Sequence, residues 1–159
     1  MATDGAPWLT RDGLRIAATI MESHHRLFGR PLLAGYATWP AHQAAQELFA
    51  AHLVVLAHDG GNDPRLIYAN AAALALWDRP WAAMVGMPSR FTAEPQERRA
   101  RSEALSLALR QEAIANYSGV RINRRGRRFR IDGARLWSLH DRTGRAFGQA
   151  ACFERWWWL

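Results

Sequence analysis

The residues best suited to hold a charged ligand surround Arg98, near the start of a predicted helix. Pro95 suits the first turn of a helix, and residues 96–111 form the longest helical pattern of the second half. Seven residues are close to two turns, so Arg98 shares a face with Leu105. A guanidinium on the apolar side of a helix must meet an anion or several carbonyl groups. Its partner is either Glu94, four residues earlier, or the carboxylate or phosphate of a ligand.

Other residues share the predicted face of Arg98 or precede the helix. The same predicted face carries Leu109 and either Arg101 or Ser102. Ser89 and Arg90 precede the helix and could supply additional hydrogen-bond donors, although a plain connecting loop explains them equally well.

Metal and covalent chemistry have little support in the sequence. Cys152 is the only cysteine, so one chain cannot form a disulfide or a thiolate metal site. The six histidines lack metal-motif spacing, so we assign no metal, and the cofactor, if there is one, stays unknown. All 21 basic residues are arginine, which excludes lysine chemistry. A small enzyme using Glu94 or Asp78 with His140 is an alternative, but no paired arrangement supports it, and we assign no catalytic residue.

Arginine is concentrated in the second half of the chain. Residues 90–159 contain 15 arginines against 7 acids, and residues 121–130 contain six arginines and no acid. Such a segment could clamp the phosphates of a nucleic acid or bind an acidic partner. A solvated, arginine-rich hairpin is the more ordinary explanation, and the aromatic RNA-binding motifs are absent. We therefore do not expect nucleic acid to be the partner.

The first part of the chain is helical. Apolar residues recur at spacings of three and four over residues 14–28, Thr10 suits the N-cap, and Gly29-Arg30-Pro31 ends the pattern. Pro40 begins a second helix. These helices form an N-terminal helical extension, which we place at residues 1–46.

The remaining residues, 47–159, have a strand-rich pattern. Residues 53–57 and 66–68 read as a hairpin around a dense cluster of turn formers, and Asn70 then suits the N-cap of a short helix. After the long helix, strand-like runs at residues 114–122, 127–131, 136–140 and 146–156 predict three antiparallel strands that end the chain. This order predicts an α+β fold with a five-stranded antiparallel sheet covered on one face by short helices.

Several separated motifs in this region resemble one known family. They are Tyr68-Ala69-Asn70 with Ala72-Ala73-Leu74, Gly86-Met87-Pro88-Ser89-Arg90, Ala93-Glu94-Pro95 with Glu97-Arg98, Tyr117-Ser118-Gly119-Val120-Arg121, Gly126-Arg127-Arg128-Phe129, Trp137, and Gly148-Gln149-Ala150-Ala151. In this order they are similar to the MEKHLA domain, a PAS-related module found alone in bacteria and at the C-terminus of certain plant homeodomain leucine-zipper factors. The similarity covers residues 47–156. It implies a PAS-like fold and a sensory role, and it supplies no established ligand.

PAS-like domains form a cleft between the inner face of the sheet and the covering helices. Period-two alternation points Asn116 and Ser118 into this cleft together with Val120, and Gln149 together with Phe153. Such groups either contact a ligand or hydrogen-bond to nearby backbone in a dry core. Cys152 falls out of step with this set, which argues against flavin photochemistry. The cleft candidates are Asn70, Ser89, Arg90, Glu94, Arg98, Asn116, Ser118, Phe129, Trp137 and Gln149.

We expect a cytoplasmic module that senses or binds a small ligand and passes the occupancy of its cleft to a partner. No apolar run is long enough for a membrane span, and no export signal is evident. The indoles of residues 156–158 cannot all lie on one sheet face, so at least one needs another cover. That cover is the helix at residues 14–28 or a second subunit, and we predict a homodimer through this helix and the outer sheet face.

Overall fold

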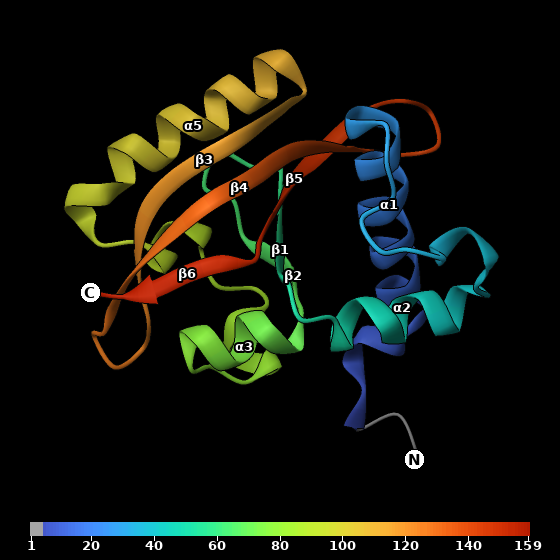
Figure 1. Ribbon diagram of the computed structural model, residues 1–159, viewed down its shortest axis with the longest axis horizontal. Coiled ribbons are helices and arrows are strands. Elements are labelled where there is room, and N and C mark those ends of the chain that lie inside the picture. Colours follow the sequence, from blue (N-terminus) through green and yellow to red (C-terminus); the bar gives the residue numbers. More distant parts are fainter. Residues whose placement is uncertain (1–4) are drawn as a thin grey trace.

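The computed structural model describes residues 5–159, so the first four residues of the predicted N-terminal extension lie outside the described part of the chain. Figure 1 shows a central sheet with helices on both sides. The helices are α1 (Arg11–Phe28), α2 (Ala41–Ala50), α3 (Ala71–Trp77), α4 (Trp81–Met84) and α5 (Arg98–Gln111), with short 3-10 turns at Pro7–Leu9, Tyr36–Thr38, Ser89–Thr92 and Pro95–Glu97. The strands are β1 (Val54–Asp59), β2 (Leu66–Ala69), β3 (Ala113–Ile122), β4 (Arg128–His140), β5 (Ala146–Phe153) and β6 (Arg155–Trp158).

The strands form one antiparallel sheet in the order β2-β1-β5-β4-β3. Strand β6 also pairs with β4, so that Arg135 lies opposite Cys152 of β5 and Ile131 lies opposite Trp156 of β6. Four residues along β4 thus correspond to four residues along the last segment, and β6 continues β5 without a change of register. The predicted strand 146–156 is therefore one β5–β6 ribbon that bends at Glu154. This arrangement confirms the predicted α+β fold and its three antiparallel C-terminal strands.

The outer face of the sheet is covered by the N-terminal helices (Figure 1). A row across the strands places Tyr68, Ala57, Ala150 and Trp137 side by side, and all four are almost fully buried. The two alanines leave room between the large rings for α1, which packs there with Ile20 and other apolar residues. The predicted extension thus shares one hydrophobic core with the sheet.

The inner face is covered by α3, α4 and α5, as the predicted layer of short helices requires. Trp77 of α3 packs edge-on against Phe129 of β4 and Phe153 of β5, with ring centroids 5.1 and 6.3 Å apart. Leu66 and Met84 complete this second, smaller apolar cluster. The cluster fills one end of the inner face and leaves the other end to more polar side chains.

Both predicted N-caps are confirmed. The Thr10 hydroxyl accepts a hydrogen bond from the Gly13 amide at 3.1 Å and starts α1. The Asn70 carbonyl oxygen accepts from the Ala73 amide at the start of α3 and also from the Val55 amide on β1. Asn70 thereby ties the start of α3 to the sheet.

The tryptophans of β6 lie on alternating sides of the strand. Trp156 and Trp158 pack edge-on against Phe129, and the Arg127 guanidinium stacks on Trp158 at 4.0 Å from the ring centroid. Trp157 points the other way and is 47% exposed. Helix α1 packs on Trp137 instead of on these indoles, so the chain itself supplies no full cover for Trp157.

None of the helices in the described part of the chain is both long and apolar enough to cross a membrane.

Candidate functional site

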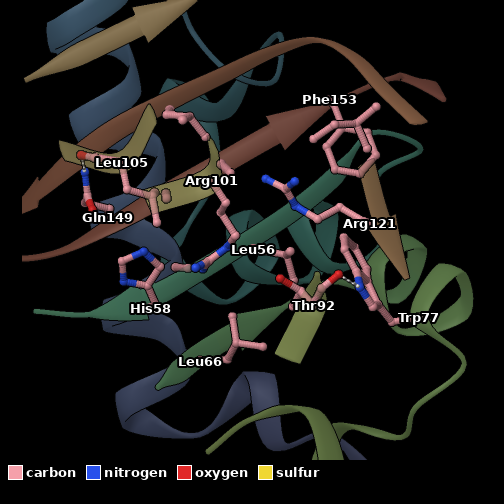
Figure 2. A pocket seen from close by; sticks show the side chains of 15 residues that line it. Leu56, His58, Leu66, Trp77, Thr92, Arg101, Leu105, Arg121, Gln149 and Phe153 are labelled. Atoms are coloured by element: carbon pink, nitrogen blue, oxygen red, sulfur yellow. Dashed lines mark hydrogen bonds between the residues drawn. The ribbon is translucent and has the colours of Figure 1, made fainter. Parts of the chain in front are cut away.

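A small cavity lies between the inner face of the sheet and helix α5, and its volume is about 50 Å³. Figure 2 shows the side chains that surround it. They come from β1, β2, α3, α5, β3, β4, β5 and the Ser89–Thr92 turn: Leu56, Ala57, His58, Leu66, Trp77, Thr92, Arg101, Leu105, Arg121, Ile131, Leu136, Gln149, Ala150, Ala151 and Phe153. Most of the lining is apolar, and its polar groups are cationic or neutral.

Arg101 enters the cavity from α5. Its face of the helix also carries Leu105 and Ala108, at spacings of four and seven residues, so the three side chains point to the sheet. Figure 2 shows the arginine reaching into the space between His58 and Leu56. Its Nη2 donates a hydrogen bond to the Ser89 hydroxyl at 2.8 Å.

Arg121 enters the cavity from β3, and its residue is only 8% exposed. Its Nη1 donates to the Val120 carbonyl at 2.9 Å and its Nη2 donates to the Tyr117 hydroxyl at 3.2 Å. Gly119 lies between the arginine and the tyrosine on the same face of the strand. A Cβ at residue 119 would sit 2.6 Å from the tyrosine oxygen, so only glycine lets the two side chains meet.

His58 and Gln149 lie opposite each other on β1 and β5 and supply the neutral polar groups. The His58 Nδ1–H donates to the Asp59 carbonyl at 2.8 Å, and its Nε2 is buried without a hydrogen-bond partner. The Gln149 amide donates to the Leu105 carbonyl at 2.9 Å, which ties β5 to α5. The histidine therefore keeps one unused hydrogen-bonding atom in the lining.

The electrostatic balance of the cavity is positive. Within residues 5–159, neither Arg101 nor Arg121 forms a salt bridge, and none of the lining residues is acidic. Burial, followed by repulsion from the Arg121 charge, lowers the pKa of Arg101 to about 10. Burial also lowers the pKa of His58, and the charge of Arg101 acts in the same direction. Two guanidinium groups thus face one space with no internal counter-charge.

Of the predicted cleft residues, Gln149 lines the cavity, and Phe129 packs beside it in the inner cluster. The inward orientation of Phe153 is confirmed as well, and Ala151 also lines the cavity. Cys152 faces the outer core, as predicted, where burial raises the pKa of its thiol to about 11.

The predicted inward orientation of Asn116 and Ser118 is wrong. Asn116 is exposed with a positive φ of 61°, and the pairing of β3 with β4 shifts register on both sides of Tyr117. The Ser118 hydroxyl instead donates to Asp132, whose other oxygen pairs with Arg155. Beyond this irregularity, residues that strict alternation would place on one face of β3 lie on the other. Arg121, which follows Val120 and would therefore point outward by strict alternation, points into the cavity.

Cross-strand pairing could have revealed Arg121 from the sequence. The turn at residues 123–126 places Arg121 opposite Phe129, and Phe129 was correctly assigned to the inner face. Directly opposed residues share a face, so the arginine must point inward as well. His58 had no comparable signal, because a histidine at the end of a strand fits either face.

Two other predicted residues have packing roles. Asn70 is fully buried, and its amide donates to the Leu48 and Leu53 carbonyls in addition to its two accepted bonds, so every polar atom of the side chain is used. Trp137 faces the outer core, where its ring lies edge-on to His24 and Phe28. Neither side chain is among those that line the cavity.

The residues around the start of α5 stabilise the loop before it. Arg98 does not pair with Glu94, because its Nε donates to the Arg90 and Ala93 carbonyls, both at 3.1 Å. Glu94 pairs with Arg128 at 2.7 Å. Ser89 is fully buried and acts through its bond to Arg101.

The remaining contacts of this loop lie at the surface. Arg90 forms an ion pair with Asp63, and its guanidinium stacks on Phe91. The face of α5 that points to the sheet is rotated relative to the predicted one. Leu109 is 59% exposed, and Arg101 lines the cavity.

Three arginines of the arginine-rich hairpin pair with two acids of the same chain. Arg124 and Arg125 both pair with Asp78, and Arg128 pairs with Glu94. His140 lies apart from these acids and contacts Glu112 at 3.3 Å. The structure therefore does not bring Glu94 or Asp78 together with His140.

Comparison with known families agrees with the geometry. The model of the MEKHLA domain matches residues 14–158 and so includes most of α1 and all of α2, whereas the similarity seen in the sequence began at residue 47. The division of the chain at residues 46 and 47 stays a prediction. No curated protein matches the chain.

Solved structures of PAS-type domains share the fold. A PAS domain of a protein from Colwellia psychrerythraea has a TM-score of 0.62 at 13% identity, over 69% of this chain and 91% of that one. An RNA-binding light-oxygen-voltage receptor has a TM-score of 0.62 at 19% identity, over 77% of this chain and only 35% of that one. A light-oxygen-voltage domain described with a flavin analogue has a TM-score of 0.57 at 16% identity, over 79% of this chain and 88% of that one.

Proposed function

The chain belongs to the MEKHLA domain family, and from this premise we propose that it is a sensory module that binds a small ligand between its sheet and α5. The observation that carries the proposal is the cavity itself, because polar groups from α5, β3, β1 and β5 converge on one space that is otherwise apolar (Figure 2). A few convergent polar groups in an apolar hollow are typical of small-molecule sites.

The residues present do not fit a flavin of the light-oxygen-voltage type. The cavity of about 50 Å³ has room for about four water molecules, whereas sites for drug-sized ligands span about 300–1,000 Å³. The only cysteine, Cys152, lies on the opposite face of the sheet. We therefore propose a ligand of a few non-hydrogen atoms, or a larger one that displaces α5 outward.

We propose binding in preference to catalysis. General acid–base chemistry needs a proton donor and acceptor placed together at the reacting group, and the cavity offers two guanidinium groups and a histidine without a carboxylate. We also propose that nucleic acid is not the partner, since three hairpin arginines pair with Asp78 and Glu94 of the same chain.

Ligand occupancy is proposed to act through a homodimer or another protein partner. Helix α1 covers the outer face of its own sheet, so a dimer would form over this helix or at the exposed aromatic end of β6, where Trp157 lies. Light scattering coupled to size-exclusion chromatography tests the dimer: a mass of twice 18.0 kDa supports it, and 18.0 kDa at all concentrations rules it out.

Cavity filling tests the binding proposal. Ala151 of β5 lines the cavity, so Ala151→Leu should fill the space, whereas Ala146→Leu places the same side chain at an exposed position of the same strand. Native mass spectrometry and a thermal-shift screen of small metabolites should detect a ligand for the wild type and for the Ala146 variant. Ligand binding that survives unchanged in Ala151→Leu, or the absence of any ligand for the wild type, overturns the proposal.

A further inference from the structure

We infer that the ligand is a small oxyanion, a carboxylate or an inorganic oxyanion, held between the guanidinium groups of Arg101 and Arg121. This inference rests on the proposed function and names its ligand class. The two arginines come from different elements, α5 and β3, and both line the one cavity (Figure 2).

The argument begins with the charge that the fold leaves uncompensated. A charge taken out of water is costly unless an opposite charge or several hydrogen bonds replace its hydration. Within the described residues, Arg101 finds only the Ser89 hydroxyl, and Arg121 finds one carbonyl and the Tyr117 hydroxyl. Each guanidinium has five N–H donors, so several of them remain free to bind a ligand.

The surroundings hold both arginines in place. Ser89 is fully buried and fixes Arg101 from the loop before α5. Gly119 allows Tyr117 to fix Arg121, and the tyrosine ring also lies 5.5 Å from the guanidinium carbon. Donors that are positioned before binding lose little entropy when an anion arrives. Planar guanidinium forks match carboxylate and oxyanion geometry.

His58 extends the set of polar contacts. Its Nδ1 is committed to the Asp59 carbonyl, and its buried Nε2 has no partner. Once protonated, this Nε2 would donate to an oxyanion that lies beside Arg101. The apolar part of the lining, including Leu56 and Phe153, would then contact the body of a small organic acid.

Matched anions and neutral isosteres test the inference. Formate and acetate are compared with formamide and acetamide, and sulfate and phosphate form the inorganic arm, by isothermal titration calorimetry of the full chain at constant ionic strength. We expect one anion per chain and no binding of the amides. Preference for the carboxylates assigns an organic acid, and preference for sulfate or phosphate assigns an inorganic oxyanion.

Arginine variants complete the test. Arg101→Met and Arg121→Met should each weaken anion binding roughly tenfold or more, because each removes a charge-assisted hydrogen bond. Arg110→Met, on the exposed side of α5, removes the same charge and should leave binding unchanged. If one arginine variant fails to fold, the other variant still tests the inference. Amide hydrogen exchange of the wild type gives a second measurement, because the bound anion should slow exchange in α5.

Two outcomes overturn the inference. Equal loss of affinity in all three variants would mean that the anion responds only to net charge. Absence of anion binding to the wild type also overturns the inference. The metabolite screen with Ala151→Leu and Ala146→Leu then separates failure of the oxyanion inference from failure of the proposed ligand-binding function. A neutral ligand that Ala151→Leu excludes preserves the proposed function, whereas no ligand of any kind removes both.

Discussion

The two faces of the sheet each bury a histidine, and they use it in opposite ways. His24 belongs to α1 and packs against the outer face of the sheet, and His58 lies at the end of β1 on the inner face. In both, Nδ1 donates to a backbone carbonyl, of Arg30 at 3.0 Å and of Asp59 at 2.8 Å, and Nε2 is buried without a partner. The difference lies in what surrounds the free nitrogen.

Around His24 the space is filled by rings. Phe28 and Trp137 lie with their centroids 4.8 and 5.1 Å from the imidazole. Around His58 the neighbours are Arg101, Gln149 and a hollow. The same side chain is therefore a packing element on one face and an available ligand group on the other, and the packing of its neighbours decides which.

The largest expected effect compares two leucines on the same strand. Leu139 is fully buried in the outer core, and Leu136 lines the cavity on the inner face. Leu139→Ala should lower the free energy of unfolding by about 4 kcal/mol and Leu136→Ala by about 2 kcal/mol, because a side chain beside an existing hollow loses fewer contacts. Urea denaturation measures both. An equal or larger cost at Leu136 would show that the inner face is as densely packed as the outer one.

A second effect follows from the outer histidine. Burial, reinforced by the charges of Arg135 and Arg30, lowers the pKa of His24 to about 4. The unfolded chain therefore binds a proton that the folded chain does not, so stability falls as the pH drops from about 6.5 to about 4 and then levels off. The loss should be about 3 kcal/mol.

The matched variant for this pH effect is His24→Asn, which keeps a donor for the Arg30 carbonyl. It should be less stable at neutral pH and should lose most of the acid dependence in chemical denaturation. A slope with pH equal to that of the wild type would assign the acid sensitivity to other groups.

The sequence predicted the outer face better than the inner one. Thr10 and the period of residues 14–28 predict α1, which covers the outer face, by local rules that the tertiary structure does not alter. The inner face depends on one irregularity of β3, where Asn116 adopts a positive φ. The bulge at this residue shifts the later side chains to the other face. Asn tolerates a positive φ better than most residues, but this preference is too weak to locate a bulge from the sequence alone.

The cavity also depends on contacts between residues that are far apart in the sequence. Arg101 and Arg121 are 20 positions apart and meet only because α5 folds back over β3. The sequence favoured Arg98 as the buried arginine and placed either Arg101 or Ser102 on the same face, and the structure satisfies Arg98 with two carbonyls. The inward face of α5 differs from the predicted face by a rotation of less than one turn. Because of this rotation, Arg101 lines the cavity and Arg98 does not.

A third, smaller effect concerns the stability of the ligand-free protein. Arg101→Met should raise the free energy of unfolding by about 1 kcal/mol, because it removes a desolvated charge that lacks a salt bridge and adds an apolar side chain of similar length. Arg110→Met serves as the exposed control and should change stability by less than about 0.5 kcal/mol. Thermal denaturation in an anion-poor buffer measures both. A clear loss of stability in Arg101→Met would make this arginine a structural residue.

The smallest effect separates the two histidines by their response to ligand. Burial and Arg101 lower the pKa of His58, whereas Asp59 on the same strand raises it, and an anion bound beside Nε2 would raise it further. The positive Arg121 also faces the cavity, and Gln149 opposite the histidine is uncharged. Binding should then take up a proton, and affinity should increase several-fold as the pH falls from about 8 to about 6. Sulfate suits the measurement, because it does not titrate in this range.

Calorimetry in two buffers of different ionisation enthalpy measures the proton uptake directly. His58→Asn should abolish the uptake and leave binding at pH 8 nearly unchanged, because at that pH the wild-type imidazole is neutral. His24→Asn should leave both quantities unchanged, since the outer histidine has no access to the cavity. Proton uptake that persists in His58→Asn would remove the histidine from the binding site and leave the two arginines as its only charged groups.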